Sequence, residues 1–219
     1  MLLWMHNLIL KMENSSQHFS KDLIINEPHS AIICGMTGCG KTVFMLELLQ
    51  GPYNGVFNNI IIICPTIKWN KTYQNCCWVW NDPGAYIVDP GENLHEWLRY
   101  LFSVFQGEPT LYIIDDCSAL KALTKKKDML SELAFSGRHV KQSVWVLTQK
   151  YNSVLKDLRE QTKWVALFHC KDKNSFNDCM DENNIIPADQ VPMIKQKLAQ
   201  TKHAKLVLKT DQPIAYKVL

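Results

Sequence analysis

The chain of 219 residues lacks any apolar run that approaches the length of a membrane-spanning helix, which is about 18 residues. The nearest candidate, residues 2–10, is interrupted by His6 and Asn7. It has no preceding basic residues and no following small-residue cleavage site, so it does not read as a secretory signal. With 47% hydrophobic and 21% charged residues, the composition predicts a globular, soluble protein without a membrane partner.

Cysteine pairs at metal-binding or redox spacing are also missing. The eight cysteines include no C-x-x-C pair and have no companion histidines at zinc spacing. We therefore expect a protein without disulfides in a reducing, intracellular compartment, either cytoplasm or nucleus. The vicinal Cys76 and Cys77, and the neighbours His169 and Cys170, are alternatives as reactive or metal-binding pairs.

What the chain does contain is a complete phosphate-binding loop of the pattern G-x-x-x-x-G-K-[ST]. Its residues are Gly35, Met36, Thr37, Gly38, Cys39, Gly40, Lys41 and Thr42. The apolar residues 31–34 predict a strand before the loop, and residues 41–50 predict a helix after it. Loop N–H groups and the helix N-terminus then converge on phosphate oxygens. We expect a bound nucleoside triphosphate, with Lys41 reaching its β- and γ-phosphates and Thr42 holding Mg²⁺.

A second apolar segment, residues 111–114, runs directly into Asp115 and Asp116. Hydrolysis at a phosphate-binding loop needs carboxylates at the end of such a strand. We expect Asp115 to hold the Mg²⁺ shell and Asp116 to orient or deprotonate the attacking water. The alternative is that the paired aspartates cap the next helix.

Motifs of several nucleotide-dependent classes are absent. Asn70-Lys71-Thr72-Tyr73 lacks the aspartate of the GTPase base-reading motif Asn-Lys-x-Asp. The transporter signature Leu-Ser-Gly-Gly-Gln does not occur, and the three arginines are too few for the arginine-rich lid of small-molecule kinases. These absences favour a mechanochemical ATPase.

The scarcity of arginine draws attention to Arg138 and Arg159, which each precede an apolar strand-like segment. A guanidinium can stabilise the charge on a transferring γ-phosphoryl group, often from a neighbouring subunit. The alternative for each is a surface ion pair. Gln149, at the end of the strand expected at residues 143–147, is placed to contact the γ-phosphate or its water. It could equally be an ordinary strand terminus.

Charge is unevenly distributed along the chain. Residues 121–173 hold 12 basic and 5 acidic side chains, whereas residues 1–120 hold 6 basic and 11 acidic ones. A local basic excess is what a contact surface for a phosphate backbone needs, and Lys125, Lys126 and Lys127 are candidates for contacting DNA. Such a cluster can also be a solvated helix face.

Strand and helix patterns alternate from residue 30 to residue 170, which predicts an α/β domain. We expect a mainly parallel five-stranded sheet with helices on both faces. Residues 66–84 look irregular, and residues 204–208 and 214–218 predict a C-terminal β-hairpin. The expected organisation is an N-terminal extension (1–21), an ATPase core (22–172), and C-terminal helices with the hairpin (173–219).

Several motifs together resemble a known family. Residues 137–149, Gly-Arg-His-Val-Lys-Gln-Ser-Val-Trp-Val-Leu-Thr-Gln, are similar to the region after the acidic strand in FtsK/HerA-type DNA-pumping ATPases. The phosphate-binding loop, Ile-Ile-Cys-Pro-Thr, Ile-Ile-Asp-Asp-Cys and Gly-Arg-His occur in the order found in poxvirus-type genome-packaging ATPases. That group extends to giant viruses, virophages and Polinton (Maverick) transposons. The resemblance covers about residues 22–170 and implies the RecA/FtsK-like ASCE fold of P-loop NTPases.

The resemblance also implies a function. Family members form a ring of subunits that couples ATP hydrolysis to pushing double-stranded DNA into a preformed capsid, at its portal vertex. Arg138 would be the leading candidate for an arginine finger that acts on a neighbour's ATP, Arg159 the second, and Gln149 the sensor. Such a protein would be found in an infected cell or associated with the virion.

Two other functions fit the same residues. A superfamily 3 replicative helicase also pairs a phosphate-binding loop with an apolar strand that ends in two acids, although it places asparagine where this chain has Gln149. Unwinding of a forked duplex would favour that reading. A slow ATP-binding switch or scaffold protein is the other alternative, and hydrolysis that DNA does not stimulate would favour it.

Overall fold

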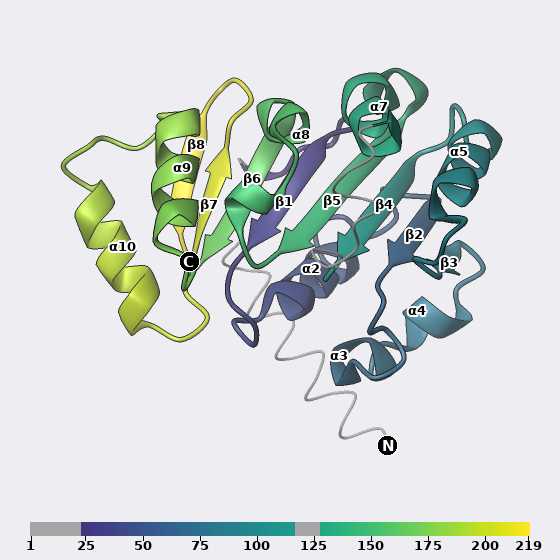
Figure 1. The fold of residues 1–219 in the computed structure, drawn as a ribbon, viewed down its shortest axis with the longest axis horizontal. Coiled ribbons are helices and arrows are strands. Elements are labelled where there is room, and N and C mark those ends of the chain that lie inside the picture. The colour runs from purple at the N-terminus through teal and green to yellow at the C-terminus, as the bar shows by residue number, and fades with distance from the viewer. Residues whose placement is uncertain (1–22, 117–127) are drawn as a thin grey trace.

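The computed structural model of the protein describes residues 23–116 and 128–219. Its strands are β1 (Ser30–Cys34), β2 (Asn59–Ile63), β3 (Ala85–Val88), β4 (Thr110–Asp115), β5 (Gln142–Thr148), β6 (Thr162–Phe168), β7 (Lys205–Lys209) and β8 (Ala215–Val218). They form one eight-stranded sheet in the order β3-β2-β4-β5-β1-β6-β7-β8 (Figure 1).

Helices connect most of these strands. The α-helices are α2 (Lys41–Gln50), α3 (Lys71–Gln74), α4 (Cys77–Asn81), α5 (Leu94–Val104), α7 (Asp128–Ser136), α8 (Lys156–Glu160), α9 (Lys173–Asn183) and α10 (Val191–Gln200). Two short 3-10 helices, η3 (Gly137–Val140) and η4 (Tyr151–Ser153), flank β5. No helix of the described residues is both long and apolar enough to span a membrane.

The predicted fold class is confirmed, but the sheet is wider than the expected five strands. Its parallel part has six strands, because β3 pairs with β2 in parallel register from Ile60 opposite Ala85. The C-terminal hairpin extends the same sheet, since β7 runs antiparallel to β6 with Leu167 opposite Leu206. The hairpin is therefore continuous with the sheet that carries the phosphate-binding loop.

Both faces of the central strands are covered, which explains why those strands are apolar throughout. On β1, Ala31 and Ile33 pack into a cluster that includes α2 side chains such as Met45. Ile32 and Cys34 point the other way, into a cluster with residues of α5, α8, α9 and α10. The alternation of side chains along each strand thus builds two cores.

The segment 66–84, expected to be irregular, forms two short helices. Asn70 caps α3, because its side chain accepts a hydrogen bond from the Thr72 backbone N–H at 3.0 Å. Tyr73 on α3 is fully buried in the cluster that includes the α2 side chains. The segment therefore contributes single side chains to the core, while Trp69 and Trp80 remain exposed.

Parts of the sequence-based expectations lie outside the described residues. These are the N-terminal extension 1–21 and Lys125, Lys126 and Lys127. The contact of these lysines with DNA therefore stays a prediction.

Candidate nucleotide-hydrolysis site

The phosphate-binding loop joins β1 to α2 with an open helix N-terminus. Gly40 adopts the left-handed conformation, with φ of 100°, and no side chain caps the helix. The first turn of α2 also contains no acidic residue. The backbone N–H groups at this terminus are thus free of a competing anion, which is the arrangement that binds phosphate.

Backbone hydrogen bonds anchor the loop to both strands beside β1. The N–H of Gly35 donates to the Thr148 carbonyl of β5 at 3.1 Å, and the N–H of Met36 donates to the His169 carbonyl at 3.0 Å. A Cβ atom at Gly35 would lie 2.5 Å from Cβ of Phe168. Gly35 is therefore required by close packing against β6.

Lys41 is held by the loop itself. Its Nζ donates to the carbonyl oxygens of Gly35 at 2.7 Å and Met36 at 3.1 Å. Both are neutral acceptors, and phosphate oxygens form stronger, charge-assisted hydrogen bonds with an ammonium group. A bound triphosphate can therefore draw Lys41 from these carbonyls to its phosphates.

Asp115 lies at the end of β4, directly beside the loop. Its Oδ2 accepts hydrogen bonds from Thr42 Oγ1 at 3.0 Å and from the Tyr73 hydroxyl at 2.9 Å. Burial raises the pKa of Asp115, while the hydrogen bonds from Tyr73 and Thr42 and the charge of Lys41 oppose that rise. The structure thus places the two predicted metal ligands in direct contact.

The donors at this position fit Mg²⁺. The Thr42 hydroxyl and the Asp115 carboxylate are hard oxygen ligands, and Mg²⁺ is usually held by one or two protein oxygens together with phosphates and water. No cysteine or histidine side chain among the described residues joins them in a cluster that could hold a softer metal.

Asp116 has a different environment from Asp115. Its side chain is exposed, and its backbone adopts φ of 55°, in the left-handed region. Gln149 Nε2 donates to Asp116 Oδ1 at 3.4 Å. Because β5 lies between β1 and β4 in the sheet, Gln149 projects between the phosphate-binding loop and the two aspartates.

These groups line one cavity of about 350 Å³. From the predicted set it includes Thr37, Gly38, Gly40, Lys41, Thr42, Asp115, Asp116 and Gln149. It also includes residues that the sequence did not suggest, namely Val43, Thr66, Asn70, Thr72, Leu147, Thr148 and His203. Thr66 follows β2, so its presence agrees with the rule that the carboxyl ends of parallel strands form the site. His203 had no comparable sequence signal.

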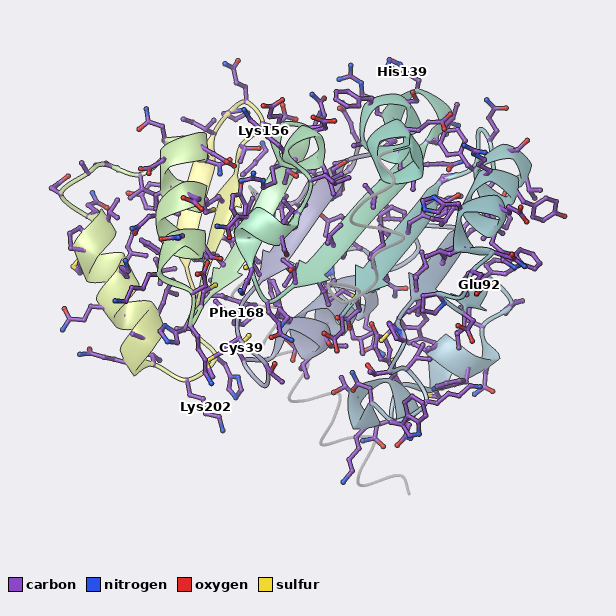
Figure 2. The ribbon with its side chains drawn as sticks, viewed as in Figure 1. Cys39, Glu92, His139, Lys156, Phe168 and Lys202 are labelled. Carbon is purple, nitrogen blue, oxygen red and sulfur yellow. The ribbon has the colours of Figure 1, made fainter. Side chains whose placement is uncertain are left out.

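None of the three arginines of the chain lines this cavity. Arg138 is exposed in η3, which precedes β5, whereas Gln149 follows β5. The two residues therefore lie at opposite edges of the sheet. Figure 2 shows this separation, with His139, the neighbour of Arg138, at one edge and Cys39 of the loop at the other.

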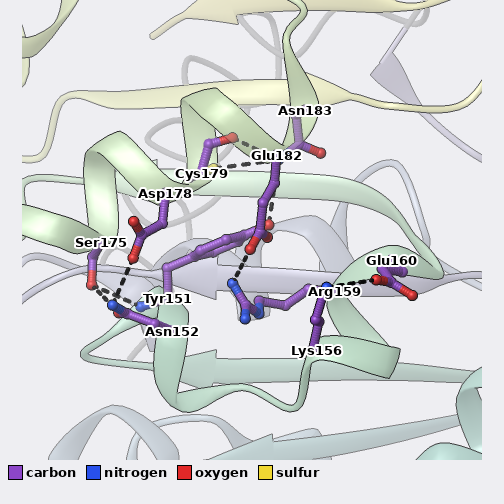
Figure 3. A network of polar contacts seen from close by, with 10 residues as sticks. All are labelled: Tyr151, Asn152, Lys156, Arg159, Glu160, Ser175, Asp178, Cys179, Glu182 and Asn183. Atoms are coloured by element: carbon purple, nitrogen blue, oxygen red, sulfur yellow. Dashed lines mark hydrogen bonds and ion pairs between the residues drawn. The ribbon is translucent and has the colours of Figure 1, made fainter.

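Arg159 is engaged in contacts within its own chain. Its guanidinium carbon lies 5.2 Å from the centroid of the Tyr151 ring, and it forms an ion pair with Glu182 of α9 (Figure 3). Its side chain is only 12% exposed. Neighbouring bonds support this link, including one from Asn152 Nδ2 to Asp178 Oδ2 at 2.7 Å. Arg159 thus joins α8 to α9 through an ion pair, the kind of contact that was named as its alternative role.

The comparison with protein families identifies the chain's relatives. The family described as Poxvirus A32 protein matches residues 16–209, nearly the whole chain. The chain belongs to the poxvirus A32 protein family. This confirms the resemblance to poxvirus-type packaging ATPases that was inferred from its motifs, and the ATPase class with it. No curated protein matches the chain in sequence.

Solved structures similar to this A32-family chain show the same fold. The DNA-packaging ATPase B204 from Sulfolobus turreted icosahedral virus has a TM-score of 0.64 at 12% identity, covering 89% of this chain and 98% of B204. B204 from Sulfolobus turreted icosahedral virus 2, in complex with ATP-gammaS, has a TM-score of 0.62 at 14% identity, covering 89% and 97%. EssC from Geobacillus thermodenitrificans (ATPases 2 and 3) has a TM-score of 0.62 at 12% identity, covering 88% and 39%.

Tyr73→Phe tests whether the hydroxyl that contacts Asp115 supports the site. The Tyr73 hydroxyl donates to the carboxylate and so favours its ionised form. Without it the pKa of Asp115 rises further, so the acidic limb of the ATPase pH profile should move to higher pH. We expect kcat/KM at neutral pH to fall about tenfold, the effect of one hydrogen bond to a charged group.

Tyr112→Phe is the matched control, because Tyr112 is buried on β4 and its hydroxyl has no hydrogen-bond partner among the described residues. This control should leave both the rate and the pH profile unchanged. An unshifted profile in Tyr73→Phe would show that the hydroxyl does not support Asp115.

Arg159→Met tests the structural role of Arg159 in this A32-family chain. Loss of the ion pair and of the contact with the Tyr151 ring should lower the free energy of unfolding by about 2 kcal/mol, measured by urea denaturation. Lys156→Met on the same helix is the control, since the exposed Lys156–Glu160 pair at 3.6 Å should contribute less than about 0.5 kcal/mol. A stable Arg159→Met protein without ATPase activity would instead favour a catalytic role.

Proposed function

We propose that the chain is one subunit of a ring that hydrolyses ATP to move double-stranded DNA into a preformed viral capsid. The family supports a packaging role, and B204, described as a DNA-packaging ATPase, shares the fold over 98% of its chain. The partners are DNA, further copies of the chain, and the capsid or its portal vertex. The protein then acts inside the infected cell, in association with the virion.

The observation that supports assembly into a ring is the absence of arginine from the nucleotide cavity. This cavity holds Lys41, both aspartates and Gln149, but no arginine. A developing charge on the γ-phosphoryl group is commonly stabilised by an arginine from a neighbouring subunit. We assign this role to the exposed Arg138, which lies at the opposite edge of the sheet from the cavity of its own subunit.

The separation between Arg138 and Gln149 supports a finger that acts on the neighbouring subunit. The seven residues of β5 lie between Arg138 and Gln149 and span about 20 Å at a strand rise near 3.3 Å per residue. An arginine side chain cannot cover that distance. A head-to-tail contact brings one edge of a subunit against the other edge of the next, and such contacts form a ring when the rotation between subunits closes.

Within each site, the described residues divide the work of hydrolysis. The loop N–H groups and Lys41 bind the phosphates, and the exposed Asp116 accepts a proton from the attacking water. Gln149, 3.4 Å from Asp116, orients that water beside the γ-phosphate. Thr42 and Asp115 would hold Mg²⁺, which would neutralise the charge that develops on the phosphates.

The proposal that DNA is the substrate rests on the excess of basic residues within residues 121–173. Of its described members, Lys141, Lys150, Lys156, Lys171 and Lys173 are exposed and available to a phosphate backbone. Each phosphate contact releases counterions, so DNA affinity should fall steeply with salt. Lys125, Lys126 and Lys127 are proposed contacts in the same block.

Mixing two inactive variants tests the shared site. Lys41→Ala removes phosphate binding and Arg138→Ala removes the proposed finger, so each protein alone should lack DNA-stimulated ATPase activity. In a mixed ring, an Arg138→Ala subunit keeps Lys41 and receives Arg138 from a Lys41→Ala neighbour. Random mixing makes about one quarter of the interfaces complete, so activity should return to about that fraction of the wild-type value.

Arg99→Ala is the control, because Arg99 is exposed on α5 and does not line the cavity. It should retain activity alone. Absence of any recovery in the mixture, with both variants folded and assembled, would contradict a finger supplied by the neighbour. Unwinding of a forked duplex by the wild-type protein would instead indicate a helicase.

A further inference from the structure

One residue at the nucleotide cavity comes from the C-terminal part of the chain. His203 lies in the connection between α10 and β7 and lines the cavity together with Gly38, Gly40 and Lys41. Its Nδ1 is 2.9 Å from the carbonyl oxygen of Cys39, which is 164 residues away in sequence. Figure 2 shows the neighbouring Lys202 at the same end of the sheet as Cys39 of the loop.

The ring of His203 packs directly against the phosphate-binding loop. A Cβ atom at Gly40 would lie 3.2 Å from His203 Nδ1, a tight contact. Gly40 immediately precedes Lys41, and the N–H groups that follow it are those that open toward phosphate. The imidazole therefore stands beside the part of the loop that receives the phosphate chain.

The backbone at His203 is held in an unusual conformation. Its φ is 64°, in the left-handed region that L side chains seldom adopt, although His does so more often than most. The connection is fixed on its C-terminal side, since Ala204 is buried and β7 pairs with β6. The surrounding structure thus maintains a strained residue at the cavity, as is common at functional sites.

The contact with Cys39 fixes the chemistry of the ring. A backbone carbonyl oxygen can only accept, so Nδ1 must carry a proton and donate it. Nε2 is then an acceptor in the neutral ring and a donor in the imidazolium, and only the second form suits a phosphate oxygen. Cys39 contacts the ring through its carbonyl oxygen. The other charged groups that line the same cavity are Lys41, Asp115 and Asp116, and Lys202 and Lys205 are near His203 in the sequence.

We propose that His203 is a nucleotide-binding residue, which holds the Cys39 carbonyl through Nδ1 and donates from Nε2 to the phosphate chain of the bound nucleotide. This role rests on the proposed ATPase function and deepens it. It adds a second donor beside Lys41 for the phosphate oxygens of the nucleotide. Because His203 lies just before the C-terminal hairpin, nucleotide binding would also contact the segment that leads into the hairpin.

His203→Asn separates the two contacts of the ring. Asparagine tolerates the left-handed backbone, and its side-chain N–H₂ can replace Nδ1 at the Cys39 carbonyl, but it has no counterpart of Nε2. The dissociation constant of ATPγS is measured by calorimetry for the full-length wild-type and variant proteins between pH 6 and 8.5. Their ratio at each pH cancels the titration of the nucleotide itself.

We expect the variant to bind ATPγS about tenfold more weakly than the wild type at pH 6. Adenosine, which has no phosphate, should bind both proteins equally. His95→Asn on α5 is the control and should bind like the wild type. If His203→Asn lowers the melting temperature, His203→Gln, which also lacks an ionisable ring, replaces it in the same comparison.

Equal ATPγS affinity of variant and wild type across the pH range would overturn the proposal. A variant that weakens adenosine as much as ATPγS would overturn the assignment to the phosphate chain. Failure of the wild-type protein to bind ATPγS would contradict the proposed function itself, so the two failures are distinguishable.

Discussion

The contact between Thr42 and Asp115, at 3.0 Å, is the constraint on which the site depends. It joins the start of α2 to the end of β4, although β5 separates β1 from β4 in the sheet. The contact can form only if the three strands end at one level, as their parallel register ensures. The Tyr73 hydroxyl donates a second hydrogen bond to the same carboxylate. Asp115 is therefore buried with two hydrogen-bond donors in place.

The same register determines what the site lacks. A parallel sheet collects its carboxyl ends at one edge, and there the loop, both aspartates and Gln149 meet. Residues before the strands collect at the other edge, where Arg138 lies in η3. One fold thus presents an arginine and an arginine-free cavity on opposite sides, and copies arranged head to tail would bring them together.

The sequence predicted the parts of the site that follow directly from strand ends. Gly35 to Thr42, Asp115 and Gln149 each adjoin an apolar run whose end was visible in the pattern. Tyr73 and His203 could not be predicted in this way, because their contacts depend on how the segment 66–84 and the α10–β7 connection fold back onto the site. An ion pair was an alternative for Arg159, but its partner could not be predicted for a similar reason, since Glu182 belongs to a helix outside the parallel core.

The most direct test of the account is the division of work between the two adjacent carboxylates. Asp116→Asn keeps the size of the side chain and removes its capacity to accept a proton, whereas Thr42 and Asp115 remain intact. In a single-turnover experiment the variant should bind ATP within about threefold of the wild-type affinity and hydrolyse it at least about 100-fold more slowly. Hydrolysis at the wild-type rate would contradict the account.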